Sequence, residues 1–227
     1  MKSVKFLSIA VLVLAMATAV PAYSAKRSSK SKKVTNTMGK YAPTSGCAVT
    51  NAKAVDLGLP SGTLWADRNV GAESPQAYGG LYRYGDKGKP SGEGCPRENI
   101  GGTKLDVATK KMGKKWRMPT AAQLHELWEN CTYAHETIDG QKGFRLTGPN
   151  GNSIFLPMTG TMYSYGRSQS GEFGFYQSGE ITGSDMYQVG FEVVVLQLWE
   201  RDDETFTPGV FKDSVGQGNA IRAVVAQ

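Results

Sequence analysis

Hydrophobic positions at helical spacing mark the clearest helix of the chain. It follows Thr120, a suitable N-cap, and Gln123 three residues later completes a capping-box pattern. Its apolar positions recur at i, i+3, i+4 and i+7, namely Leu124, Leu127, Trp128 and Cys131. Because the opposite face is polar, we predict an amphipathic helix that packs on the core through one side.

A second, shorter helix is predicted over residues 103–112. Thr103 and Asp106 are both candidate caps for its start, and Gly113 suits the position after its end. The apolar face of this helix would consist of Leu105, Ala108 and Met112. No other segment has a strong helical pattern, and the remaining chain is rich in strand and turn signals.

Short hydrophobic runs between turn residues predict antiparallel strands. The strand candidates are two within residues 55–66, then 78–84, 143–147, 153–157, 187–198 and 221–225. The turn at 148–152 contains Asn-Gly, a strong hairpin signal. The run 187–198 is apolar on both of its alternating sides, so we expect a strand that is buried on both faces.

The first 25 residues have the pattern of a secretory signal peptide. Lys2 and Lys5 precede an apolar run over residues 6–20, and small residues follow it. The run is too short and interrupted for a membrane span. Because the first cysteine, Cys47, lies far from this leader, a lipid-anchored cysteine is not expected. We predict a secreted protein, extracellular or periplasmic, without a membrane span.

Behind the leader, residues 26–53 are expected to form a basic and polar disordered linker, and residues 54–227 the folded domain. The net charge of +6 is misleading, because residues 1–33 hold seven basic side chains and no acidic one. The rest of the chain is close to neutral, so a nucleic-acid partner is not predicted. We interpret the basic run 26–33 as a solvated spacer, with electrostatic adhesion to anionic lipid or polysaccharide as the alternative.

Four segments of the domain carry a resemblance to a known family. They are VDLGLPSGTLWADRNVGA at residues 55–72, WRMPT at 116–120, TGPNGNSIFLP at 147–157 and AIRAV at 220–224. Together they resemble the Fibrobacter succinogenes major paralogous domain, found in secreted and surface proteins of Bacteroides and relatives. The resemblance implies a C-type-lectin-like α+β fold with two helices and twisted antiparallel sheets. The chain departs from the family at Gln177, where a Trp is usual.

The resemblance does not bring an activity with it. Formylglycine-generating relatives need a reactive cysteine pair late in the domain, and no cysteine follows Cys131. Calcium-dependent C-type lectins use a carboxylate next to Pro-Asn, which Gly148-Pro149-Asn150 lacks. The acidic run Asp202, Asp203 and Glu204 is the one dense carboxylate cluster. We interpret it as a solvated hairpin tip, with a calcium site as the alternative.

Catalytic and zinc patterns are weak in this sequence. The two histidines are His125, predicted to face solvent on the main helix, and His135, predicted to lie in a loop. A Cys131–His135 pair is conceivable, but Cys131 belongs to the apolar face, so we assign no catalytic residues. Two histidines without a Cys-x-x-Cys do not suggest zinc, and no cofactor is expected.

An odd number of cysteines in an oxidising compartment leaves several arrangements open. One intramolecular pair with a free thiol and an intermolecular bridge are both consistent with Cys47, Cys95 and Cys131. Cys47 and Cys95 lie in loop-like segments and are our candidates for a disulfide. Cys131 is expected to behave as a small buried hydrophobic residue.

Aromatic side chains in a Gly- and Ser-rich stretch are the best binding candidates. They are Tyr163, Tyr165, Arg167, Phe173, Phe175 and Tyr176, with Trp199 beside the acidic run. A second core layer built from these rings is an equally weighted interpretation. We hypothesise a non-enzymatic module that binds a glycan or an extracellular protein, host-derived partners included. A structural component of the envelope or a surface filament, and a hydrolase using Asp203, are the alternatives.

Overall fold

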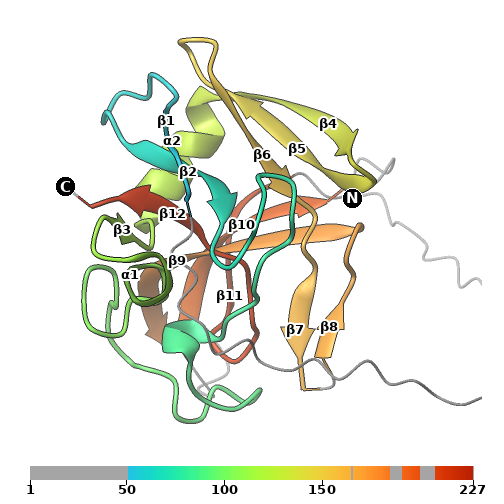
Figure 1. Cartoon of the computed structure of the whole chain (residues 1–227). Coiled ribbons are helices and arrows are strands. Elements are labelled where there is room, and N and C mark those ends of the chain that lie inside the picture. The colour runs from blue at the N-terminus through green and yellow to red at the C-terminus, as the bar shows by residue number, and fades with distance from the viewer. Residues whose placement is uncertain (1–50, 165, 185–190, 200–207, 227) are drawn as a thin grey trace, which may run out of the picture. The chain divides into compact units, whose positions relative to one another are not determined.

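The computed structural model describes residues 51–164, 166–184, 191–199 and 208–226. The predicted signal peptide, most of the linker, Cys47, Tyr165 and the acidic run 202–204 lie outside these residues. The described part contains two α-helices and twelve β-strands, so the fold is α+β and mostly sheet, as predicted (Figure 1). Neither described helix is long and apolar enough to cross a membrane.

The main helix, α2, spans Ala121–Asn130, as its sequence pattern predicts. Thr120 Oγ1 accepts a hydrogen bond from the Gln123 backbone at 3.1 Å, and the Thr120 backbone donates to Gln123 Oε1 at 3.0 Å. The capping box is therefore confirmed, and it satisfies amide groups that a helix start leaves unpaired. Leu124 and Leu127 are buried below the helix.

The second helix, α1, spans Val107–Met112 and is shorter than predicted. Of the two candidate caps, Asp106 fulfils the role, accepting from the Thr109 backbone at 3.0 Å. Thr103 instead closes a turn before the helix, where its hydroxyl donates to the Ile100 carbonyl oxygen. Gly113 ends the helix with a φ of 95°, a conformation that favours glycine.

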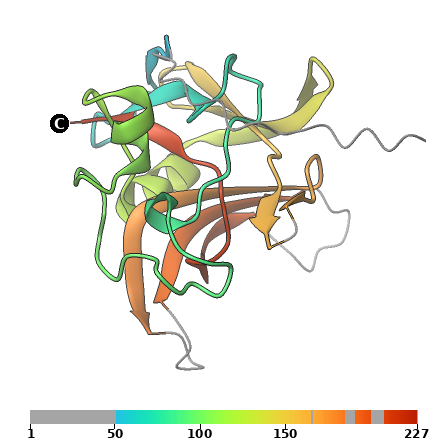
Figure 2. The same ribbon diagram turned by 60° about the horizontal axis from the view of Figure 1, so that its bottom comes forward.

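The strands form four separate sheets. In the order of their pairing, the first contains β1 (Ala54–Asp56), β2 (Leu64–Asn69), β12 (Arg222–Val225) and β3 (Trp116–Arg117). The second contains β4 (Thr132–Ile138), β5 (Gln141–Thr147) and β6 (Ser153–Pro157), and the third β11 (Gly209–Ser214), β10 (Phe191–Trp199) and β9 (Phe173–Ser184). The hairpin β7 (Thr161–Tyr163) and β8 (Gly166–Ser168) is the fourth. Figure 2 shows that the long β9 curves along its length.

Two hydrophobic cores lie on opposite sides of β10. Leu196 and Leu198 belong to a first core with α2 and the β4–β5–β6 sheet, whereas Val193 and Val195 belong to a second core with α1 and β3. The prediction of a strand buried on both faces is confirmed for Phe191–Trp199. Its segment 187–190 lies outside the described residues.

Some sequence predictions are wrong. Residues 78–84 form no strand, because Gly79 has a φ of 69° and only Tyr82 makes a bridge, with Asn219; a short 3₁₀ helix, Tyr84–Asp86, follows. Strands β3, β4, β7, β8, β9 and β11 were not among the strand candidates. His135 lies in β4, where it pairs with Phe144 of β5, and not in a loop.

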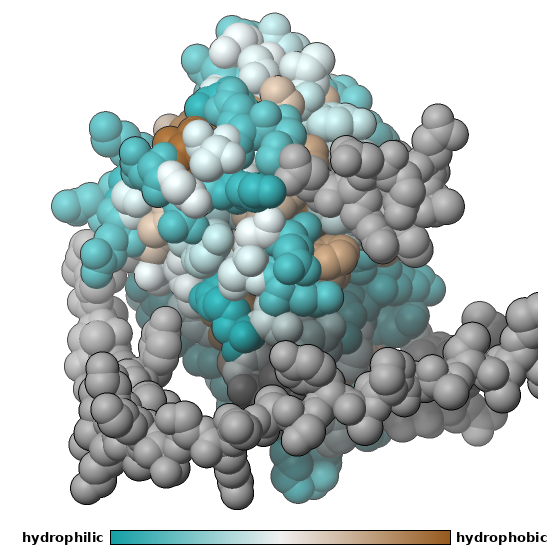
Figure 3. Space-filling view, turned by 90° about the vertical axis from the view of Figure 1, so that its right-hand side faces the viewer, coloured by the Kyte–Doolittle hydropathy of each residue, from teal (hydrophilic) through white to brown (hydrophobic). Residues whose placement is uncertain are grey.

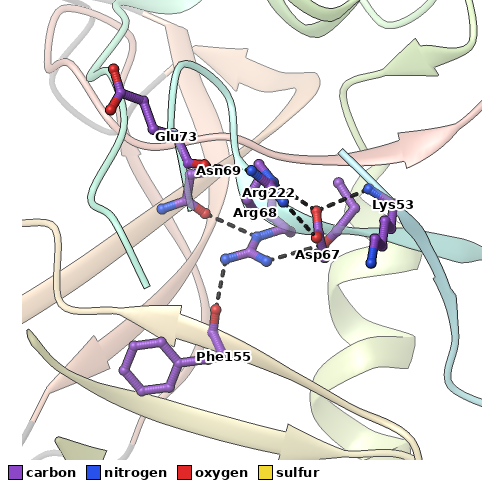
Figure 4. Close-up of polar contacts among 8 residues, drawn as sticks. Lys53, Asp67, Arg68, Asn69, Glu73, Phe155 and Arg222 are labelled. Atoms are coloured by element: carbon purple, nitrogen blue, oxygen red, sulfur yellow. Dashed lines mark hydrogen bonds and ion pairs between the residues drawn. The ribbon is translucent and has the colours of Figure 1, made fainter. Parts of the chain in front are cut away.

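A buried arginine joins three of the strands (Figure 4). Arg222 is 1% exposed. Its Nε donates to Asn69 Oδ1 at 2.9 Å, Nη1 to the Ala66 carbonyl oxygen at 3.0 Å and Nη2 to the Phe155 carbonyl oxygen at 2.7 Å. Burial disfavours the charged form and lowers the pKa of Arg222 to about 10, so the guanidinium is still protonated at neutral pH. These bonds fix β12 against β2 and β6.

Replacing Arg222 is expected to destabilise the fold strongly. Arg222→Ala leaves three buried acceptors without their donors, so the free energy of unfolding should fall by about 3–5 kcal/mol. Arg222→Lys should also destabilise, because one ammonium cannot match the fork of the guanidinium. Denaturant unfolding measures both, and Lys87→Ala at an exposed side chain serves as control, with an expected change within about 0.5 kcal/mol. An Arg222→Ala protein as stable as the parent would contradict the assigned role.

Candidate ligand-binding surface

Four aromatic rings from three neighbouring strands contact one another in the β9–β10–β11 sheet. Phe173 and Phe175 of β9 are stacked at 6.0 Å between ring centroids, and Phe173 lies 6.4 Å from Trp199 of β10. Phe211 of β11 stacks on Trp199 at 5.8 Å. We call these four residues the aromatic strip. The sequence pointed to Phe173, Phe175 and Trp199 as a group, but it gave no reason to include Phe211.

Strand register explains why these rings share one face. Phe173 is paired with Trp199 across the antiparallel ladder, and directly opposed residues point to the same side of a sheet. Along β10, Val193 and Val195 of the second core lie on the side to which Trp199 points, because side chains alternate. The aromatic strip therefore continues the second core beyond its edge.

Exposure varies along the aromatic strip. Trp199 is 9% exposed and Phe211 is 43% exposed, while Phe173 and Phe175 are half-buried. The two interpretations of these rings, core layer and contact surface, thus apply to different members of the group. Partly buried rings with defined neighbours are rigid contact elements, and aromatic faces suit both sugars and protein side chains.

A glycine shapes the exposed end of the strip. Gly209 of β11 pairs with Gln197, and a Cβ built at Gly209 would lie 3.3 Å from Cε2 of Phe211. A side chain at this position would therefore push against the Phe211 ring. The absence of one leaves the ring free to lean along the strand toward Trp199.

Tyr176 was a predicted binding residue, and the structure places it in the first core instead. It is 1% exposed, and its hydroxyl donates to the Pro157 carbonyl oxygen at 2.5 Å. Burial raises the pKa of Tyr176 well above its usual value. The reason is the strand alternation of β9, which turns Tyr176 toward the first core, while its neighbours Phe175 and Gln177 point to the opposite face of the sheet, where Gln177 is itself buried. A buried ring cannot contact a surface ligand without rearrangement.

Tyr163 and Arg167 lie on the β7–β8 hairpin, next to the start of β9. The Gly160 backbone donates to the Phe173 carbonyl oxygen at 2.7 Å, which holds the hairpin beside the aromatic strip. Arg167 donates to the carbonyl oxygens of Thr159 and Gly79, each at 2.7 Å. Arg167 therefore fastens the hairpin to a neighbouring loop. Tyr165, Asp202, Asp203 and Glu204 lie outside the described residues, so their roles stay predictions.

The two thiols of the described residues are buried and poorly reactive. Cys95 and Cys131 form no disulfide with each other, and each is 8% exposed. Burial raises the pKa of Cys131 to about 11, so its nucleophilic thiolate is scarce at neutral pH. Burial also raises the pKa of Cys95, whose Sγ donates to the carbonyl oxygens of Lys87 and Val215. The Cys47–Cys95 pairing stays a prediction, because Cys47 lies outside the described residues.

A cavity of about 190 Å³ lies beside the Arg222 network, between the β2 region and the β4–β5–β6 sheet. Its charged lining residues are Asp67 and Arg145. Asp67 accepts from Arg68 Nε and Nη2, each at 3.0 Å, and Arg145 Nη2 is paired with Glu136 at 2.9 Å. A ligand in this cavity would have to compete with these existing bonds, so the cavity is a weaker candidate than the aromatic strip.

A second cavity, of about 270 Å³, lies where the loop before α1 meets the start of β10. Arg97 and Phe191 line it, and the guanidinium lies 5.3 Å from the ring centroid. Within the described residues, no three His, Cys, Asp or Glu side chains gather as metal ligands would. The calcium hypothesis concerns residues 202–204, which lie outside that range.

Hydrophobic side chains are sparse on one face of the molecule. The face drawn in Figure 3 is mostly hydrophilic, and its hydrophobic patches are small and separate. Among the described residues, the large hydrophobic side chains that are clearly exposed are Tyr133 and Phe211.

Comparison of the chain with known protein families, with curated proteins and with solved structures found no match.

Asp67, beside the first cavity, is expected to make stability depend on pH. Its burial alone would raise its pKa, but hydrogen bonds from Arg68 and the Lys53 backbone, with the charges of Arg68 and Arg222, outweigh burial and lower it. A carboxyl whose pKa is lower in the folded state stabilises the fold above its unfolded pKa. This stabilisation is lost as the pH falls through the folded pKa.

We therefore expect Asp67→Asn to lower the free energy of unfolding by about 1–2 kcal/mol at pH 7. The difference from the parent should shrink toward zero in acid, because the protonated carboxyl of the parent is then neutral, like the amide of the variant. Unfolding curves at pH 7 and at several pH values well below 3.8, the ordinary pKa of an aspartate, measure this. Glu93→Gln, in an exposed ion pair with Lys89, is the control and should change little at either pH. A pH-independent difference for Asp67→Asn would rule out this linkage.

Proposed function

We propose that the chain is a secreted, non-enzymatic binding module of the Fibrobacter succinogenes major paralogous domain type, with a C-type-lectin-like fold. The ligand is a glycan or an extracellular protein, contacted through the aromatic strip and the neighbouring β7–β8 hairpin. The observation that carries this proposal is the contiguous contact of Phe173, Phe175, Trp199 and Phe211, which ends in an exposed ring.

The segments that carry the family resemblance support the proposal by where they lie. The first spans β1 and β2, the second β3 and the N-cap of α2, the third the end of β5 and β6, and the fourth β12. Arg222 of the fourth segment bonds to Asn69 and Ala66 of the first and to Phe155 of the third. The side chain of Arg222 thus joins three of the four segments that carry the resemblance.

Two observations favour binding over hydrolysis. Cys131 is protonated at neutral pH, as its raised pKa requires. His135, the partner considered for Cys131, lies in β4, where its ring contacts Phe144 edge-on at 5.5 Å between ring centroids. A nucleophile aligned with a base is the signature of acyl transfer, and neither group fits that role. The aromatic strip has the composition of a recognition surface.

Substitutions in the aromatic strip test the proposal. We expect a mixed array of glycans and extracellular proteins, probed with calcium and with EDTA, to return at least one reproducible ligand. Phe175→Ala and Phe211→Ala should each weaken the binding of that ligand by about tenfold or more. Truncation of an aromatic hot-spot side chain typically lowers the binding free energy by more than about 1.4 kcal/mol. Titration by calorimetry measures the change. A calcium-dependent signal would favour a cation at residues 202–204.

Phe191→Ala is the matched control. Phe191 is a partly buried ring at the other end of β10 from Trp199. Unchanged affinity in the two Phe variants of the strip, or an equal loss in Phe191→Ala, would remove the strip as the binding site. An array without any ligand, together with a stable oligomer on non-reducing gels, would favour the structural-component alternative.

A further inference from the structure

A second surface, away from the aromatic strip, concentrates positive charge. Residues 34–227 carry 19 basic and 20 acidic side chains. Six of those basic residues, but a single acidic one, Asp106, fall within the 14 positions 104–117. We call the six the basic face: Lys104, Lys110, Lys111, Lys114, Lys115 and Arg117. Because the folded part as a whole is near neutral, this is a strong local imbalance.

The fold gathers these residues on one small unit. After α1 the chain turns at Gly113 into β3, and the Trp116 backbone donates to the Gly113 carbonyl oxygen at 3.0 Å. Thr109 Oγ1 then donates to the Trp116 carbonyl oxygen at 2.7 Å, so β3 is fastened to the helix. Figures 1 and 2 both show α1 at the margin of the domain. The basic side chains of the helix end and the turn therefore lie close together.

The one acid of this segment does not offset its charge at the surface. Asp106 is fully buried. Its Oδ1 caps α1 through the Thr109 backbone, and its Oδ2 accepts from the backbones of Gly102 at 2.8 Å and Met118 at 2.9 Å. The carboxylate is thus engaged inside the unit, whereas Lys104, Lys110, Lys114 and Lys115 are exposed.

Few internal contacts neutralise the basic face. Lys111 pairs with Asp86 at 3.3 Å, where both side chains are well exposed. Lys115 lies over the Trp116 ring, 5.3 Å from its centroid, and that contact leaves its charge in place. Among the described residues, the other five cations make no ion pair with a carboxylate. Nε of Arg117 is buried without a hydrogen-bond partner, which leaves a donor unused.

We infer that the basic face binds an anionic polysaccharide through its sulfate or carboxylate groups. Neighbouring positive charges repel one another, and a bound polyanion relieves that repulsion. Binding also releases the counterions of the polyanion. Membrane docking fits less well, because it combines basic with exposed apolar side chains. The clearly exposed rings of the described residues, Tyr133 and Phe211, lie on other sheets.

A single-stranded nucleic acid also fits less well than a polysaccharide. Its binding sites combine cations with exposed aromatic platforms on which bases stack. The aromatic ring of the basic face, Trp116, is 3% exposed and covered by its neighbours. The basic face therefore offers ionic contacts to a ligand but no exposed ring for base stacking. This second binding surface lies on elements distinct from the aromatic strip and does not depend on the function proposed for it.

The test uses the full chain and measures binding to immobilised dextran sulfate and polygalacturonate, with neutral dextran as reference. Both anionic polymers should bind, with affinity that falls steeply as salt is raised. The double variant Lys110→Glu/Lys114→Glu should weaken this binding by about tenfold or more. The matched control is Lys53→Glu/Lys212→Glu, which makes the same change in net charge at exposed lysines elsewhere and should lose far less. Equal melting temperatures verify that both variants fold.

Several outcomes would overturn the inference. Equal losses in the two double variants would mean that net charge, with the basic run 26–33, accounts for the binding. Tighter binding to phosphatidylserine vesicles than to either polysaccharide would assign the surface to a membrane. Tighter binding to single-stranded DNA would assign it to a nucleic acid. Equal binding to neutral dextran would show that charge is not the recognised feature.

Discussion

The buried guanidinium of Arg222 is the constraint on which the arrangement of the domain depends. A charged group leaves water at a high cost in free energy, so it stays buried only where acceptors are fixed around it. Ala66 and Asn69 of β2 and Phe155 of β6 supply those acceptors. The planar fork of the side chain accepts little variation in their positions. The C-terminal strand therefore sets the relation between a central sheet and the β4–β5–β6 sheet.

Once these strands are fixed, the two cores and the aromatic strip follow from strand alternation. Trp65 of β2 lies in the first core and its neighbour Ala66 in the second; Val224 and Ala223 of β12 are divided in the same way. The longer β10 runs beyond the second core on one side. Its last residue, Trp199, is covered by Phe173 and Phe211. The candidate site is thus built on a rigid sheet, as precise recognition requires.

Local signals in the sequence predicted those parts of the fold that local interactions determine. The Thr120–Gln123 box fixes where α2 begins, and the loop at 148–152 joins β5 and β6 as expected. The hairpin of β4 and β5 was missed although Asp139-Gly140 is a hairpin signal, with φ values of 49° and 78°. Most residues of β4 are exposed, so the strand has no hydrophobic pattern to reveal it.

Long-range pairing explains what the sequence could not show about the candidate site. The segment that forms β9 reads as an irregular Gly- and Ser-rich stretch, and its register comes from β10. Without that register, Tyr176 and Phe175 are equivalent neighbours, although one lies in the core and the other on the strip. Phe211 joins the strip only through the pairing of β11 with β10. The sequence shows that the segment is rich in aromatic residues, but the face of the sheet on which each ring lies depends on strand pairing in the folded protein.

Net charge illustrates the same limit for electrostatics. Counting side chains makes the folded part nearly neutral and argues against a nucleic-acid partner. The count treats Asp106 as equal to any surface carboxylate, but the fold encloses it to cap α1 and to hold the start and end of the segment together. The interaction that keeps the unit folded therefore removes the one negative charge from its surface. The potential that a partner meets depends on which charges the fold leaves outside, and near α1 and β3 those are mostly positive, with Asp86 beside Lys111 as an exception.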